Sequence, residues 1–492
     1  MPLWASFVGP AYRVRSENMN AEQLVNAYVE TITASGNAKK SNFYGTPGLK
    51  LFLTIPTTGS RGAFDQDGLT LFVVGDRLYS INLVLSSATD LGEILNDGKP
   101  VSFASNGRGG EQIAICGGGQ VKILDLLTMT LSAAVVLPLT NAPVQIAFID
   151  GYFLLLEANT IRVWFSNLED GLIWDSLDFF ARSQTSDNLV GIKVLRDKVW
   201  TFGSLTTEVF YDAGDNDNPF QPYPGSIMQE GLVSPWAVGL QGESLVWMAQ
   251  DNEGKGRIVS ATDYAPTRIS TPALDFALAS YASLADAEVA VYEQEGHPFA
   301  CWTLAAAGVT WCYDARESSV RGEPVWHQRE TYDPVTAQST AWRVRGLVST
   351  TAGILVGDIA TGGIYTLDLD TFCDACGSMR RIRTAPYISD DNQWLFLDQI
   401  ELGIQAGVGT LEGTDRDPHL FAEISRDGGH TFDPPVEASI GALGDYNNTA
   451  TWYQCGRVRS DRFVFRVTQT AEVRMVWGPG LWLRATPGSG QL

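Results

Sequence analysis

The sequence predicts an all-β protein in which a β-propeller of about six blades, with seven as the alternative, precedes a separate C-terminal β-domain. Two observations predict this architecture: a hairpin pattern recurs over residues 64–370, and longer strands replace it beyond Cys376. The composition agrees, because 49 Gly and 14 Trp provide many turns and large apolar anchors for short strands. An extended N-terminal arm completes the expected architecture.

The recurring unit is an apolar strand, a turn at Gly or Asp, and a second apolar strand. Its copies cover residues 71–81, 113–124, 146–164, 194–211, 244–259, 299–313 and 354–367. A spacing of roughly 40 to 55 residues is typical of propeller blades, each a four-stranded sheet covered only by its neighbours. A pair of β-sandwiches, which also contains regular hairpins, is the alternative.

Three segments follow from these patterns. Residues 1–60 are rich in Pro and Gly, and we expect an arm that docks on a partner, with one short helix over residues 21–28. Residues 61–372 are expected to form the propeller. Residues 373–492 are expected to form the C-terminal β-domain.

The charge balance excludes some functions. There are 34 basic and 56 acidic residues, so the net charge is −22, and polyanions are repelled at long range. A protein that reads nucleic-acid sequence is therefore disfavoured. The N-terminal residues lack a secretory signal, and no stretch approaches the about 18 apolar residues of a membrane span, which predicts a soluble cytosolic product without a membrane anchor.

The six cysteines do not form an evenly spaced framework. Cys301 and Cys312 flank a turn and are expected to face each other across a hairpin, but a reducing cytosol favours free thiols. Cys373 and Cys376 form a CxxC pair without a second pair of ligands, so we expect no metal.

Catalytic motifs are not apparent in the sequence. G-x-S-x-G, HExxH and phosphate-binding loop patterns are missing. The four histidines fall at hairpin edges or in turns: His297, His327, His419 and His430. The sequence therefore predicts neither an enzyme nor a cofactor.

Two pairs of carboxylates, Asp390 with Asp391 and Asp415 with Asp417, could serve a glycosidase. Both pairs lie in turn-like polar stretches, where capping of the turn is the commoner role of Asp. A propeller-type protein that binds or hydrolyses glycans is the alternative function, and it would need an Arg-lined pocket or an aromatic platform.

One segment is close to the Asp-box pattern S-x-D-x-G-x-T-W of sialidase-like propellers. Its residues are Ser425, Asp427, Gly429, Thr431 and Phe432. We expect a structural role, in which the Asp carboxylate accepts hydrogen bonds from turn amides, Gly adopts a positive φ, and the aromatic ring anchors the turn in the core.

A basic stretch contains Arg380, Arg381 and Arg383. Because the surrounding chain is acidic, we expect these arginines at a protein or subunit interface rather than on DNA.

Further motifs occur in a characteristic order along the chain. The N-terminal motif comprises Phe7, Gly9, Pro10, Tyr12, Asn26, Tyr28, Tyr44, Gly45, Pro47 and Gly48. Later motifs include residues 219–221, 294–297, 326–329 and 456–457. Together these residues resemble the packaged-DNA stabilisation proteins of podoviruses, and the resemblance covers nearly the whole chain.

The resemblance implies a structural virion protein, the hub or nozzle of a short phage tail. It implies a hexameric ring beneath the portal and its adaptor, the head-to-tail connector, with tail needle and tail fibre or spike proteins as further neighbours. Such a ring retains packaged DNA and conducts it during ejection, without sequence-specific binding. The expected location is the virion tail, after assembly in the host cytoplasm.

Overall fold

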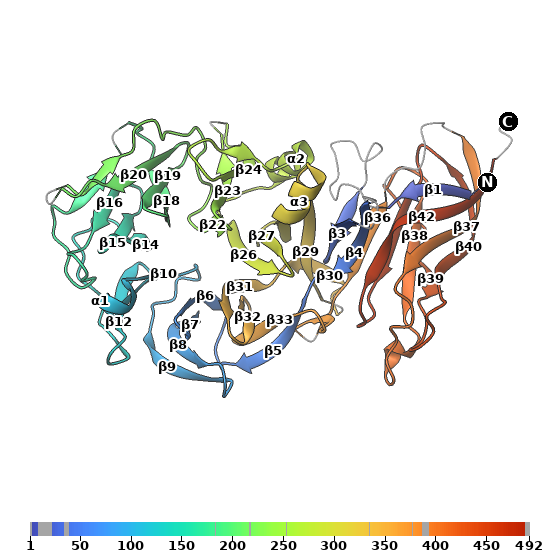
Figure 1. Cartoon of the computed structure of the whole chain (residues 1–492), viewed down its shortest axis with the longest axis horizontal. Coiled ribbons are helices and arrows are strands. Elements are labelled where there is room, and N and C mark those ends of the chain that lie inside the picture. The colour runs from blue at the N-terminus through green and yellow to red at the C-terminus, as the bar shows by residue number, and fades with distance from the viewer. Residues whose placement is uncertain are drawn as a thin grey trace.

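The computed structural model describes residues 2–7, 22–33, 39–182, 184–215, 218–251, 253–333, 335–375, 377–385 and 393–487. Within these residues, nearly all regular structure is antiparallel β-sheet. The strands form a ring of blades and, beside it, a sandwich of two sheets (Figure 1). Both chain ends lie at the sandwich end of the molecule.

Seven sheets form the blades, so the propeller has the larger of the two expected blade numbers. Strands in the middle of a blade are mostly buried and accordingly mostly apolar. The first three blades contain β6 (Ser60–Gln66), β7 (Leu69–Val74), β8 (Arg77–Asn82) and β9 (Ser87–Glu93); β10 (Ser102–Ser105), β11 (Gln112–Gly117), β12 (Gln120–Asp125) and β13 (Thr130–Leu131); β14 (Pro143–Ile149), β15 (Tyr152–Glu157), β16 (Arg162–Phe165) and β17 (Phe179–Ala181).

The next three blades continue the same antiparallel order. They contain β18 (Leu189–Leu195), β19 (Lys198–Gly203), β20 (Thr207–Asp212) and β21 (Phe220–Pro222); β22 (Val238–Gln241), β23 (Ser244–Gln250), β24 (Gly256–Ala261) and β25 (Thr267–Arg268); β26 (Glu288–Gln294), β27 (His297–Leu304), β28 (Val309–Asp314) and β29 (Val325–Asp333). A short strand, β30 (Gln338–Ala341), pairs with β29.

The seventh blade closes the ring with a strand from the N-terminal part of the chain. Its strands are β31 (Val344–Thr350), β32 (Gly353–Asp358), β33 (Gly363–Asp368) and β5 (Gly48–Thr54). β5 pairs antiparallel with β33, so residues more than 300 positions apart complete one sheet. The small hairpin β34 (Cys373–Asp374) and β35 (Gly377–Ser378) adjoins β5.

Three short helices lie between the strands: α1 (Gly107–Gly110), α2 (Pro272–Ser280) and α3 (Ala315–Arg321). The side chain of Thr271 caps α2 by accepting a hydrogen bond from the amide of Leu274 at 3.3 Å. Asp314 caps α3 in the same way, and Gly322 ends it at a φ of 74°.

The sandwich combines strands from both ends of the chain. One sheet contains β3 (Ala27–Thr33), β4 (Lys39–Gly45), β42 (Val476–Pro487), β37 (Trp394–Ile404) and β40 (Ala450–Arg459), with β1 (Pro2–Ser6) on β42. The other contains β2 (Gln23–Val25), β36 (Arg381–Ala385), β41 (Val464–Gln469), β38 (His419–Ser425) and β39 (Val436–Ser439). A single turn of 3₁₀ helix, η1 (Thr414–Arg416), precedes β38.

Alternation along β37 shows how the sandwich core forms. Leu395, Leu397, Ile400 and Leu402 point into the space between the two sheets and are buried there, whereas the intervening side chains face outward. The core therefore lies between the sheets, as in other sandwiches.

The described parts of residues 1–60 do not form an arm. β1 to β4 belong to the sandwich and β5 belongs to the propeller. The expected helix over residues 21–28 is also wrong, because Asn26, at a φ of 50°, separates β2 from β3. Long-range pairing with β29, β36 and β42 decides the structure of this segment, and local composition does not reveal such pairing.

Candidate functional site

The Asp-box segment connects β38 to β39 in the sandwich. Ser425 Oγ donates to Asp427 Oδ1 at 2.7 Å and accepts from the amide of Gly429 at 2.8 Å. The Asp427 carboxylate accepts from the Thr431 amide at 2.9 Å and from the Thr431 hydroxyl at 2.6 Å. These donors, the Thr431 side chain first, lower the pKa of Asp427 below its usual range. The polar groups of the motif thus stabilise the loop in which they lie.

The aromatic residue of the box differs from the expectation. Phe432 is half-buried at the sandwich surface, and the guanidinium of Arg466 lies 3.5 Å from its ring centroid. Phe432 is therefore held by a cation–π contact with β41 rather than by the core.

Arg426, inside the box, reaches across to β40. It donates to the carbonyl oxygens of Cys455, at 3.0 Å, and Arg457, and it pairs with Asp433 at 2.9 Å. The two carbonyls flank Gly456, whose φ of 81° marks the irregularity in the pairing of β37 with β40. The Asp-box loop thus stabilises a bulge in the neighbouring sheet.

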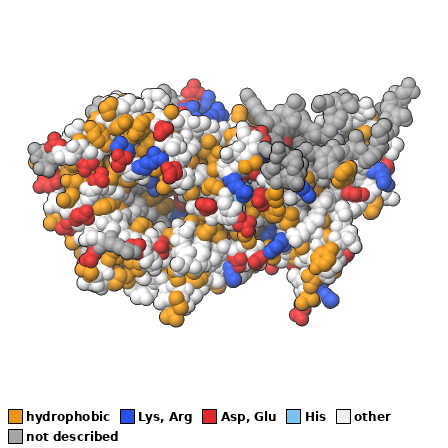
Figure 2. Space-filling model, viewed as in Figure 1, with side chains coloured by type: hydrophobic (Ala, Val, Ile, Leu, Met, Phe, Trp, Pro, Cys, Tyr) orange, Lys and Arg blue, Asp and Glu red, His pale blue; other side chains and the backbone are white. Residues whose placement is uncertain are grey.

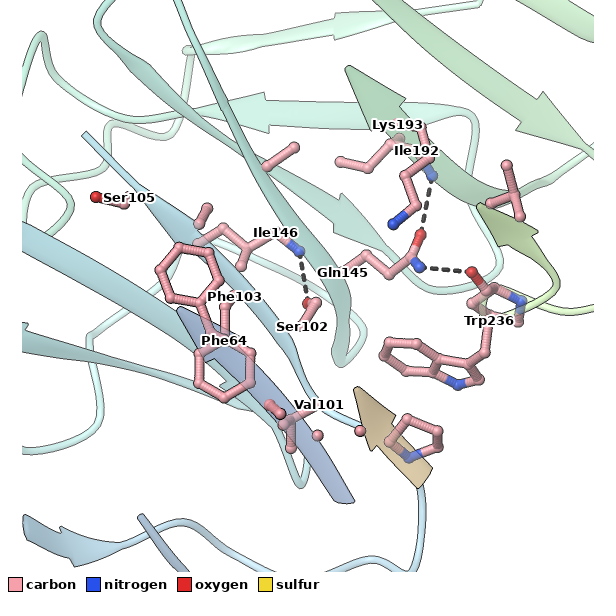
Figure 3. A pocket seen from close by; sticks show the side chains of 18 of the residues that line it. Phe64, Val101, Ser102, Phe103, Ser105, Gln145, Ile146, Ile192, Lys193 and Trp236 are labelled. Carbon is pink, nitrogen blue, oxygen red and sulfur yellow. Dashed lines mark hydrogen bonds between the residues drawn. The ribbon is translucent and has the colours of Figure 1, made fainter. Parts of the chain in front are cut away.

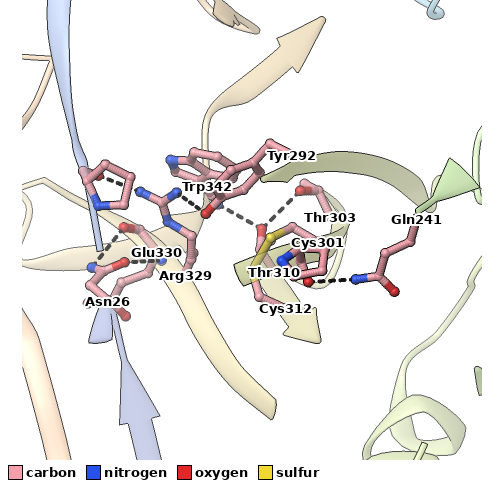
Figure 4. Close-up of a disulfide and its surroundings, with 12 residues drawn as sticks. Asn26, Gln241, Tyr292, Cys301, Thr303, Thr310, Cys312, Arg329, Glu330 and Trp342 are labelled. Atoms are coloured by element: carbon pink, nitrogen blue, oxygen red, sulfur yellow. Dashed lines mark hydrogen bonds between the residues drawn. A yellow bond between two sulfur atoms is a disulfide. The ribbon is translucent and has the colours of Figure 1, made fainter. Parts of the chain in front are cut away.

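The N-terminal motif lies at the junction between propeller and sandwich. The side-chain amide of Asn26 donates to the carbonyl oxygens of Glu330, at 3.1 Å, and Arg380, at 2.9 Å (Figure 4). Its Oδ1 accepts from the amide of Glu330 at 3.1 Å. This one buried side chain joins three segments that are distant in the sequence.

Aromatic residues of the motif fill the cores on both sides of the junction. Phe7 is buried in the sandwich core against Phe43. Tyr28 is buried against His297, with ring centroids 5.3 Å apart, and against Tyr44 at 6.0 Å. Three further motif residues lie outside the described residues: Gly9, Pro10 and Tyr12.

The end of the motif needs small residues because other chain segments approach closely. A Cβ at Gly45 would lie 2.8 Å from Nε of Arg381, and one at Gly48 would lie 2.2 Å from the carbonyl oxygen of Thr371. Between them, the carbonyl oxygen of Pro47 accepts from Arg329 at 2.8 Å. These motif residues therefore pack the junction, and their role there is structural.

Two of the three predicted interface arginines are buried. Arg383 lies within the sandwich, where it donates through Nε to the carbonyl oxygen of Phe7 at 2.9 Å, and its Nη2 lies 3.6 Å from Glu22 Oε2. Arg381 is equally buried, beside Gly45 at the junction, and desolvation lowers its pKa to about 10. Neither side chain can meet another subunit or DNA, so the expectation of a subunit interface is wrong for these two arginines.

Arg380, the third arginine, is only partly buried. It pairs with Glu330 at 2.8 Å and lies over the ring of Tyr332, 4.0 Å from the centroid.

Burial raises the pKa of the Glu22 carboxyl, the partner of Arg383, to about 7, although the charge of Arg383 acts in the opposite direction.

Cys301 and Cys312 are directly opposite each other in β27 and β28, with Cα atoms 4.0 Å apart, and the structure joins them in a disulfide (Figure 4). The expectation of free thiols is therefore wrong for this pair. Strand register brings two buried sulfurs into contact, whereas the expectation rested on the compartment alone. Cys376 lies outside the described residues.

Two of the four histidines lie in the propeller core and two in the sandwich. His297 Nδ1 lies 2.7 Å from Asp314 Oδ2, and both side chains are buried. Burial lowers the pKa of His327 to about 3, so it is neutral in the core. His419 and His430 belong to the sandwich, the latter to the Asp-box loop.

A cavity of about 710 Å³ lies on the propeller axis, lined by the innermost strand of every blade. Phe64 and Phe103 stack in its wall, with centroids 5.6 Å apart (Figure 3). Gln145 joins neighbouring blades, because it donates to the carbonyl oxygen of Pro235 at 2.6 Å and accepts from the amide of Ile192 at 2.9 Å.

Five charged residues line this cavity: Arg61, Asp65, Lys193, Glu288 and Arg345. Arg345 pairs with Glu288 at 2.8 Å, and desolvation lowers the pKa of Lys193, which lines the wall. Sequence reasoning missed Lys193, although a lone charge in the apolar strand Leu189–Leu195 was a usable signal. The described lining contains neither His nor Cys.

The described residues contain no group of three or more His, Cys, Asp or Glu side chains arranged to hold a metal ion. In the same residues, no helix is long and apolar enough to cross a bilayer. Of the carboxylate pairs, Asp390 and Asp391 lie outside the described residues, and Asp415 accepts from the amide of Glu472 at 3.1 Å.

A closed propeller joined to a β-sandwich by a buried junction defines a two-domain all-β protein. Residues 13–372 match the family described as Bacteriophage P22 Gp10, beta-propeller, and residues 380–479 match Bacteriophage P22 Gp10, beta-sandwich. The chain belongs to this family of phage structural proteins, which confirms the resemblance seen in the sequence.

Other comparisons add little. No curated protein matches the sequence. The N-terminal domain of Nup159 is 11% identical, with a TM-score of 0.40, over 73% of this chain and 98% of that chain. PorZ, a surface component of the type-IX secretion system of Porphyromonas gingivalis, is 12% identical, with a TM-score of 0.37, over 71% of this chain and 44% of that chain. Scores this low carry no argument.

Proposed function

We propose that the chain is the hub or nozzle subunit of a short phage tail, and that it acts mechanically rather than as an enzyme. Family membership over both domains carries this proposal. Copies of the chain form a ring, a hexamer, that extends the channel of the portal and its adaptor. The ring retains packaged DNA, meets tail needle and fibre or spike proteins, and becomes part of the virion tail after assembly in the host cytoplasm.

Two physical features support a mechanical role. The propeller and the sandwich are joined by backbone pairing of β2 with both β29 and β36, and Asn26 adds hydrogen bonds to Glu330 and Arg380; together these contacts resist relative motion of the two domains. The net charge of −22 repels a duplex and adds few phosphate contacts at which DNA could stick. The ring would then retain DNA by blocking its exit rather than by binding it.

DNA retention in particles tests the proposal. Particles assembled without this chain should package DNA but lose it, which nuclease sensitivity of the DNA measures. Purified chain should restore protection, and so should the surface variant Arg196→Glu, which changes an exposed propeller side chain. Full protection without the chain would contradict the proposal.

A separate binding experiment tests whether duplex DNA can slide freely through the ring. A titration of the assembled ring with duplex DNA at about 0.15 M salt should show weak binding. Tight binding with a steep negative dependence on salt would refute a freely sliding duplex. Arg381 and Arg383 could not explain such binding, because both are buried.

A further inference from the structure

A second cavity, of about 240 Å³, lies at the junction between the propeller and the sandwich. Its lining comes from both sides of the junction and includes Tyr28, Tyr44, Thr46 and Arg381 from the sandwich side, and Glu295 and Phe372 from the propeller side. A water molecule takes up about 30 Å³ of the liquid, so the cavity has room for several waters or for one small molecule. We call it the junction cavity.

The guanidinium of Arg381 faces the junction cavity without a partner. Arg381 is only 1% exposed, and its Nε and Nη1 have no hydrogen-bond partner among the described residues. It forms no ion pair with a described residue either, and its one printed contact is with the ring of Phe372, whose centroid lies 5.7 Å away. A buried cation is costly unless a counter-charge and hydrogen bonds replace the water that it has lost.

Other buried arginines show what Arg381 lacks. Arg61 pairs with Asp97 at 2.7 Å, and Arg182 pairs with Asp187 at 3.1 Å. In both pairs the guanidinium also donates to backbone carbonyl oxygens. The fold therefore supplies a carboxylate to these two buried arginines and leaves Arg381 without one.

The charged side chains around Arg381 do not neutralise it. Desolvation lowers the pKa of Arg381 to about 10, and the charge of Arg329, a second buried cation, acts in the same direction. Glu472 acts in the opposite direction, but it is exposed and lies beyond ion-pair distance. A small anion in the junction cavity would supply the missing counter-charge.

The junction cavity also offers hydroxyl donors. The Thr46 hydroxyl is buried without a hydrogen-bond partner among the described residues. The hydroxyls of Tyr28 and Tyr44 make no hydrogen bond with a described residue either. These groups can donate to an anion at the same place as Arg381.

The rim of the junction cavity carries charge of both signs. Arg474 adds a second guanidinium, which pairs with Asp370 at 2.8 Å and is largely exposed. Glu295 is the only acidic side chain in the described lining, and it is exposed in the turn between β26 and β27. Water screens an exposed carboxylate, so its repulsion of an anion is weaker than the attraction of the buried guanidinium.

We propose that the junction cavity binds one small oxyanion, a phosphate group. A guanidinium donates to two oxygens of a phosphate side by side, and the remaining oxygens can accept from the hydroxyls of Thr46 and the two tyrosines. Water could accept the same hydrogen bonds, but it could not neutralise the buried charge. A duplex cannot reach Arg381, so the phosphate is free or belongs to a small molecule.

The rest of the chain does not attract anions from a distance. The net charge is −22, and Asp and Glu are spread over the propeller in Figure 2. The affinity must therefore come from the donors within the junction cavity. The inference concerns a single chain and does not depend on the proposed ring.

Titration with inorganic phosphate tests the proposal. Calorimetry of the wild type in phosphate-free buffer should show one site per chain. The melting temperature should rise more with sodium phosphate than with sodium chloride at equal ionic strength. Because phosphate also stabilises proteins without a specific site, the comparison includes Arg381→Met and the matched surface control Arg196→Met.

The variants separate binding from a structural role. Without phosphate, Arg381→Met should be at least as stable as the wild type, because it removes an unpaired buried cation. With phosphate, it should lose the specific rise in melting temperature, whereas Arg196→Met should keep it. Thr46→Val, which removes one donor, should bind phosphate about tenfold more weakly.

Three results would overturn the proposal. The first is an equal response of the wild type and Arg381→Met to phosphate, and the second is the lack of a calorimetric signal from the wild type. The third is acetate that binds as tightly as phosphate, which would make a carboxylate the occupant instead. If Arg381→Met does not fold, the wild-type titration and Thr46→Val decide the question.

Discussion

Two arginine-rich regions of this molecule differ in almost every physical respect. In and beside the domain junction, Arg329, Arg381 and Arg383 are buried, and desolvation lowers the pKa of each. On the outward surface of β37, β40 and β42, called the outer sandwich face, Arg457 and Arg484 are exposed, and neither forms an ion pair with a described residue. The comparison teaches that burial decides whether an arginine in an acidic chain needs partners to replace its lost water or stays hydrated without them.

The largest expected effect is at the junction. Arg383→Ala should lower stability by about 3–5 kcal/mol, because it removes a fully buried side chain, leaves a cavity and takes away the donor to the carbonyl oxygen of Phe7 and the ion-pair partner of Glu22. Denaturant unfolding measures the loss. The double variant Arg383→Met with Glu22→Gln should lose less, since it removes both charges. A loss below about 1 kcal/mol for Arg383→Ala would show that the buried pair matters little.

The pH dependence of stability is the next largest effect. Because the pKa of Glu22 is raised from 4.5 to about 7 in the folded state, the folded chain binds the extra proton between these values. Stability from this group should therefore be highest below about pH 4.5 and fall by at most about 3 kcal/mol as the pH rises to about 7.

Glu22→Gln should remove that dependence, measured as the difference in unfolding midpoint between variant and wild type across the pH range. The exposed control Glu243→Gln, which pairs only with Arg196 at the surface, should leave the curve unchanged. Parallel curves for wild type and Glu22→Gln would mean that Glu22 is charged in the fold throughout.

The Asp-box lies between the two regions in character, because its polar groups stabilise a loop that supports the outer sandwich face. Asp427→Ala should cost about 1–3 kcal/mol through lost hydrogen bonds to Thr431. Since the pKa of Asp427 is lowered in the fold, its contribution is present above about pH 4 and lost as the pH falls further. Asp427→Asn, which keeps an acceptor, should cost less; an unchanged melting temperature for Asp427→Ala would exclude the capping role.

The smallest effect on stability is expected on the outer sandwich face itself. Arg484→Gln should change the unfolding free energy by no more than about 0.5 kcal/mol. Arg457→Gln should cost about 0.5–1 kcal/mol, because it also loses the contact with Trp394. A loss above about 2 kcal/mol at Arg484 would place this arginine with the structural group and remove the contrast between the two regions.

Some of the site could be predicted from the sequence because its signals are local. The Asp-box lies within eight consecutive positions, and the hydrogen bonds among Ser425, Asp427, Gly429 and Thr431 join residues no more than four apart. The facing of Cys301 and Cys312 also followed from one hairpin. The role of Asn26 did not, since its partners are more than 300 residues away.

The sequence by itself determined the all-β class, the blade period and the change of pattern after the propeller. Strand alternation and turn residues depend on neighbouring positions, so a short stretch of sequence reveals them. Only the tertiary structure decided that β5 closes the seventh blade, that β1 to β4 build the sandwich, and that two of the three predicted arginines are buried. The physical reason is that pairing partners and burial depend on which distant segments meet, and no local pattern records them.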